Sequence, residues 1–206
     1  MEVGTLTRDG VRLAYAETGS GAPPLLFVHA WSADRTTFAP QLEHFGRSHR
    51  AVAVDLRGHG DSDKPEEPYT AELFADDLAW LAGELGLERP VVVGHSMGGV
   101  IALVLAASHP DLVSGVVALD SPIIPSKELL AAVPMLMEGM RSPAYREVIR
   151  QFYDAFAGFE DDPARREQLL ERLTSGEQHV MASALENVFA ADTEAAAAAC
   201  HGPELT

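Results

Sequence analysis

The sequence predicts an α/β fold in which a mostly parallel sheet is covered by helices on both faces. Short, continuously apolar runs alternate with helical patterns up to residue 120, helical patterns follow to residue 200, and 204–206 could begin another strand. Runs of this kind are typical of strands buried on both faces, and helices between them imply parallel pairing. An Asp-Gly turn near the start adds an antiparallel hairpin.

The predicted strands follow from these patterns in chain order. The hairpin joins 5–6 to 11–15 through Asp9-Gly10. Three further runs are apolar throughout and too short for a helix: Leu25–Val28, Ala51–Val54 and 91–93. The run Gly115–Leu119 completes the predicted sheet.

Helices are expected over 37–45, 71–85 and 97–107, because apolar residues recur there at helical spacing. Residues 1–120 are therefore expected to form the core, 121–191 an inserted helical cap, and 192–206 an incomplete return to the core. We expect the prolines of the cap to separate several short helices: Pro125, Pro134, Pro143 and Pro163.

Composition narrows the classes of partner. Fifteen basic and 31 acidic residues give a formal charge of -16, which disfavours nucleic acid and anionic membranes. The longest apolar stretch, 100–107, is far shorter than the roughly 20 residues that cross a bilayer, and no signal peptide is recognisable. Cys200 is the only cysteine. We expect a cytoplasmic protein with a small-molecule substrate and no metal or cofactor, and the oligomeric state stays open.

The strongest chemical signal is Gly-x-Ser-x-Gly between a predicted strand and a predicted helix. Gly94 and Gly98 give the sharp turn the room that it needs, and Ser96 then presents its hydroxyl at the turn. The N–H of Met97, at the start of the helix, is positioned to stabilise a developing oxyanion.

Three segments carry a resemblance to a known family: FVHAW at 27–31, DLRGHGDS at 55–62 and GHSMGG at 94–99. Together they resemble the α/β-hydrolase superfamily, in its cap-bearing esterase and lactonase-like branch. The resemblance covers the chain to residue 120 and, more loosely, the cap. It implies hydrolysis of carboxylic esters or lactones through an acyl-enzyme on Ser96. Carbon–carbon bond hydrolases and cofactor-free haloperoxidases of the same fold remain alternatives.

The resemblance also implies roles for two further residues. The Trp31 N–H becomes the second oxyanion donor, and its side chain is as readily explained by packing. Ala30 stands where the family usually has glycine, so a positive φ there would cost free energy. Asp120, directly after a predicted strand, becomes the acid of the catalytic triad, the alternative being a carboxylate that caps the following turn.

The catalytic base is the missing part of this prediction. Chain order in the fold is serine, acid, histidine, and only His179 and His201 follow Asp120. Neither follows a core strand, so we expect the chain to be truncated before its catalytic histidine. A non-catalytic, ligand-binding remnant is the competing hypothesis.

Other features receive structural interpretations. Residues 57–60 lack the third glycine of a dinucleotide site, and His59 and His95 are expected to brace or pack. Dehalogenases and epoxide hydrolases of this fold are disfavoured, because they use a carboxylate at the elbow. Several large apolar residues of the cap could line an acyl pocket, although core packing explains them better: Met135, Met137, Met140, Phe152, Phe156, Phe159 and Met181.

Overall fold

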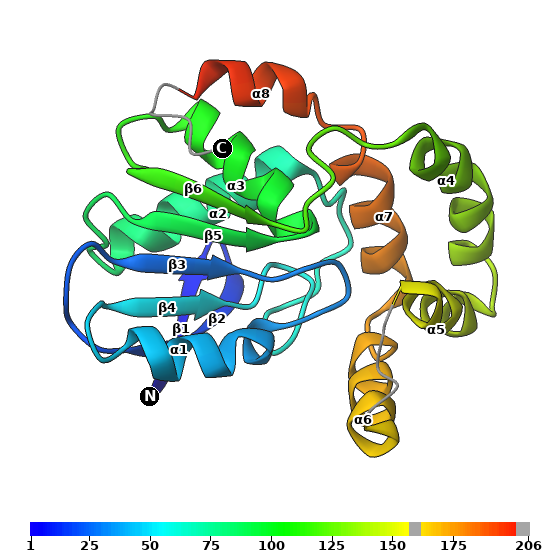
Figure 1. Cartoon of the computed structure of the whole chain (residues 1–206), viewed down its shortest axis with the longest axis horizontal. Coiled ribbons are helices and arrows are strands. Elements are labelled where there is room, and N and C mark those ends of the chain that lie inside the picture. The colour runs from blue at the N-terminus through cyan, green and yellow to red at the C-terminus, as the bar shows by residue number, and fades with distance from the viewer. Residues whose placement is uncertain (157–161, 201–206) are drawn as a thin grey trace.

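The computed structural model describes residues 1–156 and 162–200. Its sheet has six strands in the order β1-β2-β4-β3-β5-β6 (Figure 1). Strands β3 to β6 pair in parallel, whereas β1 and β2 add an antiparallel hairpin at one side. The predicted mostly parallel sheet is confirmed. The strands are β1 (Glu2–Arg8), β2 (Val11–Thr18), β3 (Leu25–Val28), β4 (Ala51–Val54), β5 (Val91–His95) and β6 (Gly115–Leu119).

The hairpin forms where the Asp-Gly pair predicts it. Asp9 and Gly10 have φ values of 50° and 83°, the left-handed conformation that suits a two-residue hairpin loop. This turn fixes the register of β1 on β2, from Glu2 opposite Glu17 to Arg8 opposite Val11.

Helices cover both faces of the sheet, as predicted. The short helix η1 (Arg35–Phe38) and α1 (Ala39–Phe45) pack on one face, where Phe27, Phe38 and Leu42 form a small core. A larger core lies on the opposite face. Its helices are α2 (Ala71–Glu84) and α3 (Met97–Ser108), and α8 (Thr193–Ala199) packs against α3.

The central and outer parallel strands differ in burial. Every residue of β3 and β4 is buried, which explains their uninterrupted apolar sequences. β6 pairs with β5 alone among the described strands, and Val117 and Leu119 are 42% and 40% exposed. No strand of the described residues pairs with the outer edge of β6, an arrangement that can accept a further strand.

Four helices form a layer beside the carboxyl ends of the parallel strands, and we call this layer the cap (Figure 1). They are α4 (Lys127–Met140), α5 (Tyr145–Phe156), α6 (Pro163–Leu173) and α7 (Gln178–Val188). The expectation that Pro134 separates helices is wrong, because α4 continues through it. Pro163 instead begins α6, a position where the missing N–H has no cost.

The apolar residues of the cap are largely core, as the packing interpretation predicts. Met137, Met140 and Met181 are buried in the main core, whereas Met135 is 75% exposed. The Phe156 side chain, Phe159 and His201 lie outside the described part of the chain.

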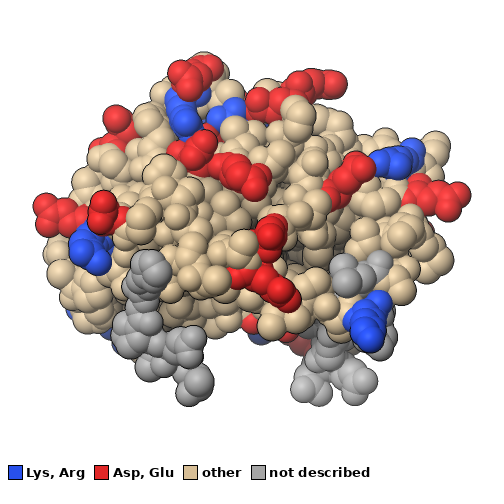
Figure 2. Space-filling model, turned by 90° about the horizontal axis from the view of Figure 1, so that it is seen from above, with Lys and Arg blue, Asp and Glu red and all other residues tan. Residues whose placement is uncertain are grey.

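The surface reflects the acidic composition. Figure 2 shows acidic side chains spread over the face seen from above, among a mostly uncharged surface. Within the described residues, no helix is long and apolar enough to span a bilayer.

Candidate active site

Ser96 occupies a sharp turn between β5 and α3. Its backbone has φ 50° and ψ −115°, a combination that L-residues rarely adopt and that is common at active sites. The Ser96 N–H donates to Leu119 O on β6 at 2.9 Å. The strained turn is thus tied to the end of the neighbouring strand.

The two motif glycines are required by close backbone contacts. A Cβ on Gly94 would lie 2.1 Å from Gly98 O, and a Cβ on Gly98 would lie 2.2 Å from Val28 O. Neither contact is with a movable side chain. These glycines allow α3 to start directly against β3 and β5, as the steric argument from the sequence predicts.

The Ser96 side chain is partly exposed. Within residues 1–156 and 162–200, its hydroxyl makes no hydrogen bond. Met97 is the first residue of α3, so its N–H has no partner within the helix. The positive end of the α3 dipole and this free N–H lie next to the serine, an arrangement that can stabilise negative charge on a bound oxygen.

Asp120 lies beside the elbow at the end of β6. Leu119, the residue before it, accepts a hydrogen bond from the Ser96 N–H. Ser121, the residue after it, lies against α3, because a Cβ on Gly99 would be only 2.0 Å from Ser121 Oγ. Asp120 itself is exposed, with a left-handed φ of 44°. Its charge also reaches His95, whose pKa burial lowers while Asp120 opposes the shift.

The loop of residues 29–34 follows β3, next to the elbow. Ala30 does not have the positive φ considered from the sequence; the left-handed residue of this loop is Ser32, with φ 57°. The buried His29 accepts the Leu56 N–H at Nε2 (3.1 Å), so its Nδ1 carries the proton and donates to Ala30 O (2.8 Å). Burial lowers the pKa of His29 to about 4, which keeps this tautomer neutral.

These bonds determine where the Trp31 N–H points. Ala30 O accepts from His29 and from the Ala33 N–H (3.1 Å). Because the peptide is planar and trans, fixing this carbonyl also fixes the N–H on its other side, which belongs to Trp31. The Trp31 side chain is only 3% exposed, and its indole N–H donates to Met181 O at 2.9 Å. The packing interpretation of the side chain is confirmed.

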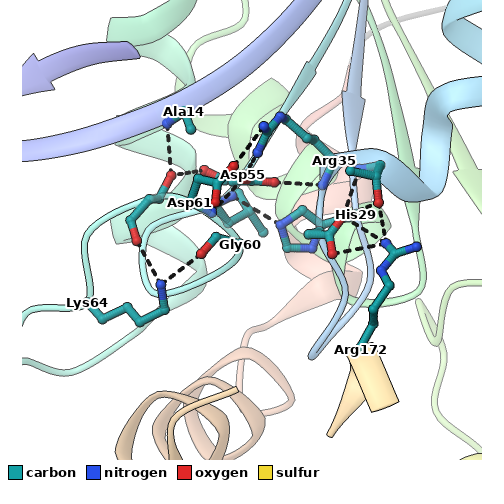
Figure 3. A network of polar contacts seen from close by, with 12 residues as sticks. Ala14, His29, Arg35, Asp55, Gly60, Asp61, Lys64 and Arg172 are labelled. Atoms are coloured by element: carbon teal, nitrogen blue, oxygen red, sulfur yellow. Dashed lines mark hydrogen bonds and ion pairs between the residues drawn. The ribbon is translucent and has the colours of Figure 1, made fainter. Parts of the chain in front are cut away.

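A buried carboxylate, Asp55, lies beside Arg35, the residue that follows this loop (Figure 3). Asp55 forms an ion pair with Arg35 and accepts the backbone N–H groups of Arg35 (2.7 Å) and Asp61 (2.8 Å). A Cβ on Gly60 would lie 2.2 Å from this carboxylate. Burial raises the pKa of Asp55. The 55–62 motif is therefore structural here.

His59 braces the 55–62 loop, as predicted. Its Nδ1 donates to Arg57 O at 3.0 Å, and its ring centroid lies 5.0 Å from that of His29. Burial lowers its pKa to about 3. A cavity of about 60 Å³, far smaller than a typical ligand site, lies between His59, Lys64 and Arg172.

Two cap residues that no sequence pattern singles out also touch the 29–34 loop. Tyr153 on α5 donates to Trp31 O at 2.5 Å, and Arg172 on α6 pairs with Asp34 at 2.9 Å (Figure 3). Both lie more than 120 residues from their partners, so local periodicity contains no trace of these contacts.

The described histidine after Asp120 does not reach the serine. His179 lies on α7, with its ring centroid 6.2 Å from Tyr69 and its Nδ1 3.5 Å from Glu177. In the described part of the chain, no three His, Cys, Asp or Glu residues are grouped so that they could hold a metal ion.

The chain matches the family described as alpha/beta hydrolase fold over residues 23–193. It belongs to this family. A 2-(acetamidomethylene)succinate hydrolase of Mesorhizobium japonicum is 41% identical over 120 residues, which are 58% of this chain and 43% of that protein. Epoxide hydrolase 3 of Xenopus tropicalis is 37% identical over 117 residues, 55% of this chain and 32% of that protein. The matched part thus spans less than half of either relative.

Solved α/β-hydrolase structures superpose over most of the chain. The enol-lactonase from Burkholderia xenovorans has a TM-score of 0.83 at 25% identity, covering 96% of this chain and 78% of that structure. A thermophilic esterase from Thermogutta terrifontis has a TM-score of 0.76 at 28% identity, covering 91% and 72%.

Proposed function

We propose that this chain carries the nucleophile and oxyanion site of a serine hydrolase that acts on carboxylic esters or lactones. The observation that carries the proposal is the strained Ser96, with a hydroxyl that no described residue engages, at the start of α3. The likeness to an enol-lactonase and an esterase supports this substrate class. Epoxide opening is less well supported, although an epoxide hydrolase is among the relatives, because serine replaces the carboxylate at the elbow.

In the proposed mechanism, Ser96 Oγ attacks the carbonyl carbon of the substrate. The carbonyl oxygen becomes an oxyanion that accepts hydrogen bonds from the N–H groups of Met97 and Trp31. The alcohol then leaves with a proton, and water hydrolyses the acyl-enzyme.

The proton transfers require a base, which we propose is a histidine outside the described residues. Asp120 would orient this histidine and stabilise its charged form. This role for Asp120 is supported by the hydrogen bond from the Ser96 N–H to Leu119 O, which joins the end of β6 to the elbow.

The nucleophile is tested with a fluorophosphonate on the chain and on its Ser96→Ala variant. Mass spectrometry should locate one adduct, on Ser96, and the variant should remain unmodified. An adduct on another serine, or equal modification of the variant, would contradict the proposal. Complete absence of reaction would favour the ligand-binding remnant.

The acid is tested by Asp120→Asn in a form of the protein that hydrolyses p-nitrophenyl esters. Turnover should fall by about 10⁴-fold with the fold intact, because the histidine loses its orienting carboxylate. Asp111→Asn, on an exposed turn before β6, is the control and should leave turnover unchanged. A near-normal rate for Asp120→Asn would place the acid elsewhere.

A further inference from the structure

One of the contacts between the cap and the 29–34 loop is made by a tyrosine hydroxyl on the loop backbone. Tyr153 donates to Trp31 O at 2.5 Å and accepts a hydrogen bond from Ser32 Oγ at 3.2 Å. Its ring also stacks on Trp31, with centroids 6.5 Å apart and planes 18° apart. The contact combines aromatic packing with a polar bond to the backbone.

The Tyr153 hydroxyl bonds to the peptide group that follows Trp31, whereas residues of the core and of the loop itself hold the peptide group that precedes it. The Ala30–Trp31 peptide, which carries the Trp31 N–H, is fixed at Ala30 O by His29 and Ala33. The Trp31–Ser32 peptide leads into the left-handed Ser32, a conformation that serine leaves readily unless its surroundings hold it. Tyr153 supplies the bond at Trp31 O that opposes this relaxation.

We propose that Tyr153 is a positioning residue that fixes the Trp31 N–H in the direction required of an oxyanion donor. The inference rests on the proposed function, in which the Trp31 N–H is an oxyanion donor. Tyr153 acts through Trp31 and contacts no reacting atom. Docking of the cap on the core and completion of the oxyanion site are then one event.

Helix α5 offers a matched control. Tyr145 donates its hydroxyl to Gly176 O at 3.1 Å, a contact between two parts of the cap. Tyr145→Phe and Tyr153→Phe each remove one tyrosine hydroxyl that bonds to a backbone carbonyl, and both keep the ring. Only Tyr153→Phe changes the 29–34 loop.

Two measurements on the 206-residue chain test the proposal. The first is the rate of fluorophosphonate addition to Ser96 as a function of reagent concentration. Tyr153→Phe should lower the limiting rate constant roughly three- to tenfold, as expected for one hydrogen bond, and leave the half-saturating concentration unchanged. The second is amide hydrogen exchange, which should accelerate in the 29–34 loop by a similar factor. Tyr145→Phe should stay within about twofold of the parent in both.

The outcomes separate the inference from the proposed function. If Ser96 reacts in the parent and the two variants give equal rates and equal loop exchange, the positioning role is overturned and the nucleophile stands. If Ser96 does not react even in the parent, the proposed function fails. Amide hydrogen exchange in the 29–34 loop then tests the coupling of cap and loop on its own. Acceleration in Tyr153→Phe alone would support this coupling, and unchanged exchange would overturn it.

Discussion

The elbow and the 29–34 loop follow neighbouring strands of one sheet, yet they are held in place by different means. The elbow is built within a few residues: two glycines leave room for the backbone, and strand and helix follow directly on either side. The 29–34 loop depends on distant residues, Leu56 in the core and Tyr153, Arg172 and Met181 in the cap. One half of the proposed oxyanion site is thus locally encoded, and the other is assembled by tertiary contacts.

The elbow should tolerate substitution less well than the 29–34 loop. In Gly98→Ala the new Cβ would meet Val28 O, which cannot move without displacing β3. We expect a loss of about 3 kcal/mol or more, or no folded protein. Gly83→Ala is the control, because its Cβ would meet no atom within 4 Å and alanine favours a helix. Urea unfolding of both variants makes the comparison, and a stable Gly98→Ala protein would show that the elbow tolerates a side chain.

Acid should expose the dependence of the 29–34 loop on neutral histidines. The pKa of His29 falls from 6.5 to about 4 on folding, so its stabilising contribution is complete above pH 6.5 and is lost as the pH falls towards 4. The loss is on the order of 3 kcal/mol for His29 alone, and His59 adds to it.

The pH dependence is measured by urea unfolding between pH 7 and 4. His29→Gln should flatten the curve, whereas His44→Gln, at an exposed site on α1, should leave its shape unchanged. Identical slopes for His29→Gln and the parent would assign the acid sensitivity to other groups.

Asp55 and Asp61 both pair with Arg35, so they allow a test of the network next to the 29–34 loop. Asp55 is fully buried, whereas Asp61 is 75% exposed. Asp55→Asn should lower the free energy of unfolding by about 2 kcal/mol, because charged hydrogen bonds are lost without solvent to replace them. Asp61→Asn should change it by less than about 1 kcal/mol. Equal changes in the free energy of unfolding for the two variants would show that the burial of Asp55 contributes little to stability.

The smallest effect is expected at the cap. Arg172 pairs with Asp34 at a half-exposed site, and Arg141 pairs with Glu186 within the cap. Arg172→Gln and Arg141→Gln should each cost less than about 1 kcal/mol of stability. Only Arg172→Gln should accelerate amide exchange in the 29–34 loop, and equal exchange in the two variants would confine the coupling to Tyr153.

The same contrast explains what could be predicted from the sequence. Strand bounds such as Leu25–Val28 and Ala51–Val54 are matched residue for residue, because a strand buried on both faces must be apolar throughout. The elbow is predicted equally well, since Gly94, Ser96 and Gly98 fall within one short Gly-x-Ser-x-Gly motif. The prediction that Pro134 separates two helices is wrong because α4 accommodates this proline in its interior.

The supports of the 29–34 loop could not be predicted in the same way. No periodicity links Tyr153 to Trp31 or Arg172 to Asp34. The left-handed conformation of Ser32 is not predicted either, because the family pattern has its glycine at the position of Ala30. Side-chain contacts made across the fold decide that conformation, and they appear only in three dimensions.

The strained backbone of Ser96 has a consequence for evolution in the laboratory. Its φ of 50° and ψ of −115° suit glycine better than any residue with a side chain. A library screened only for heat resistance or soluble expression should therefore enrich Ser96→Gly and lose the proposed nucleophile. Selection schemes for this protein need a chemical readout at every round, because survival of the fold and survival of the reaction favour different residues at this position.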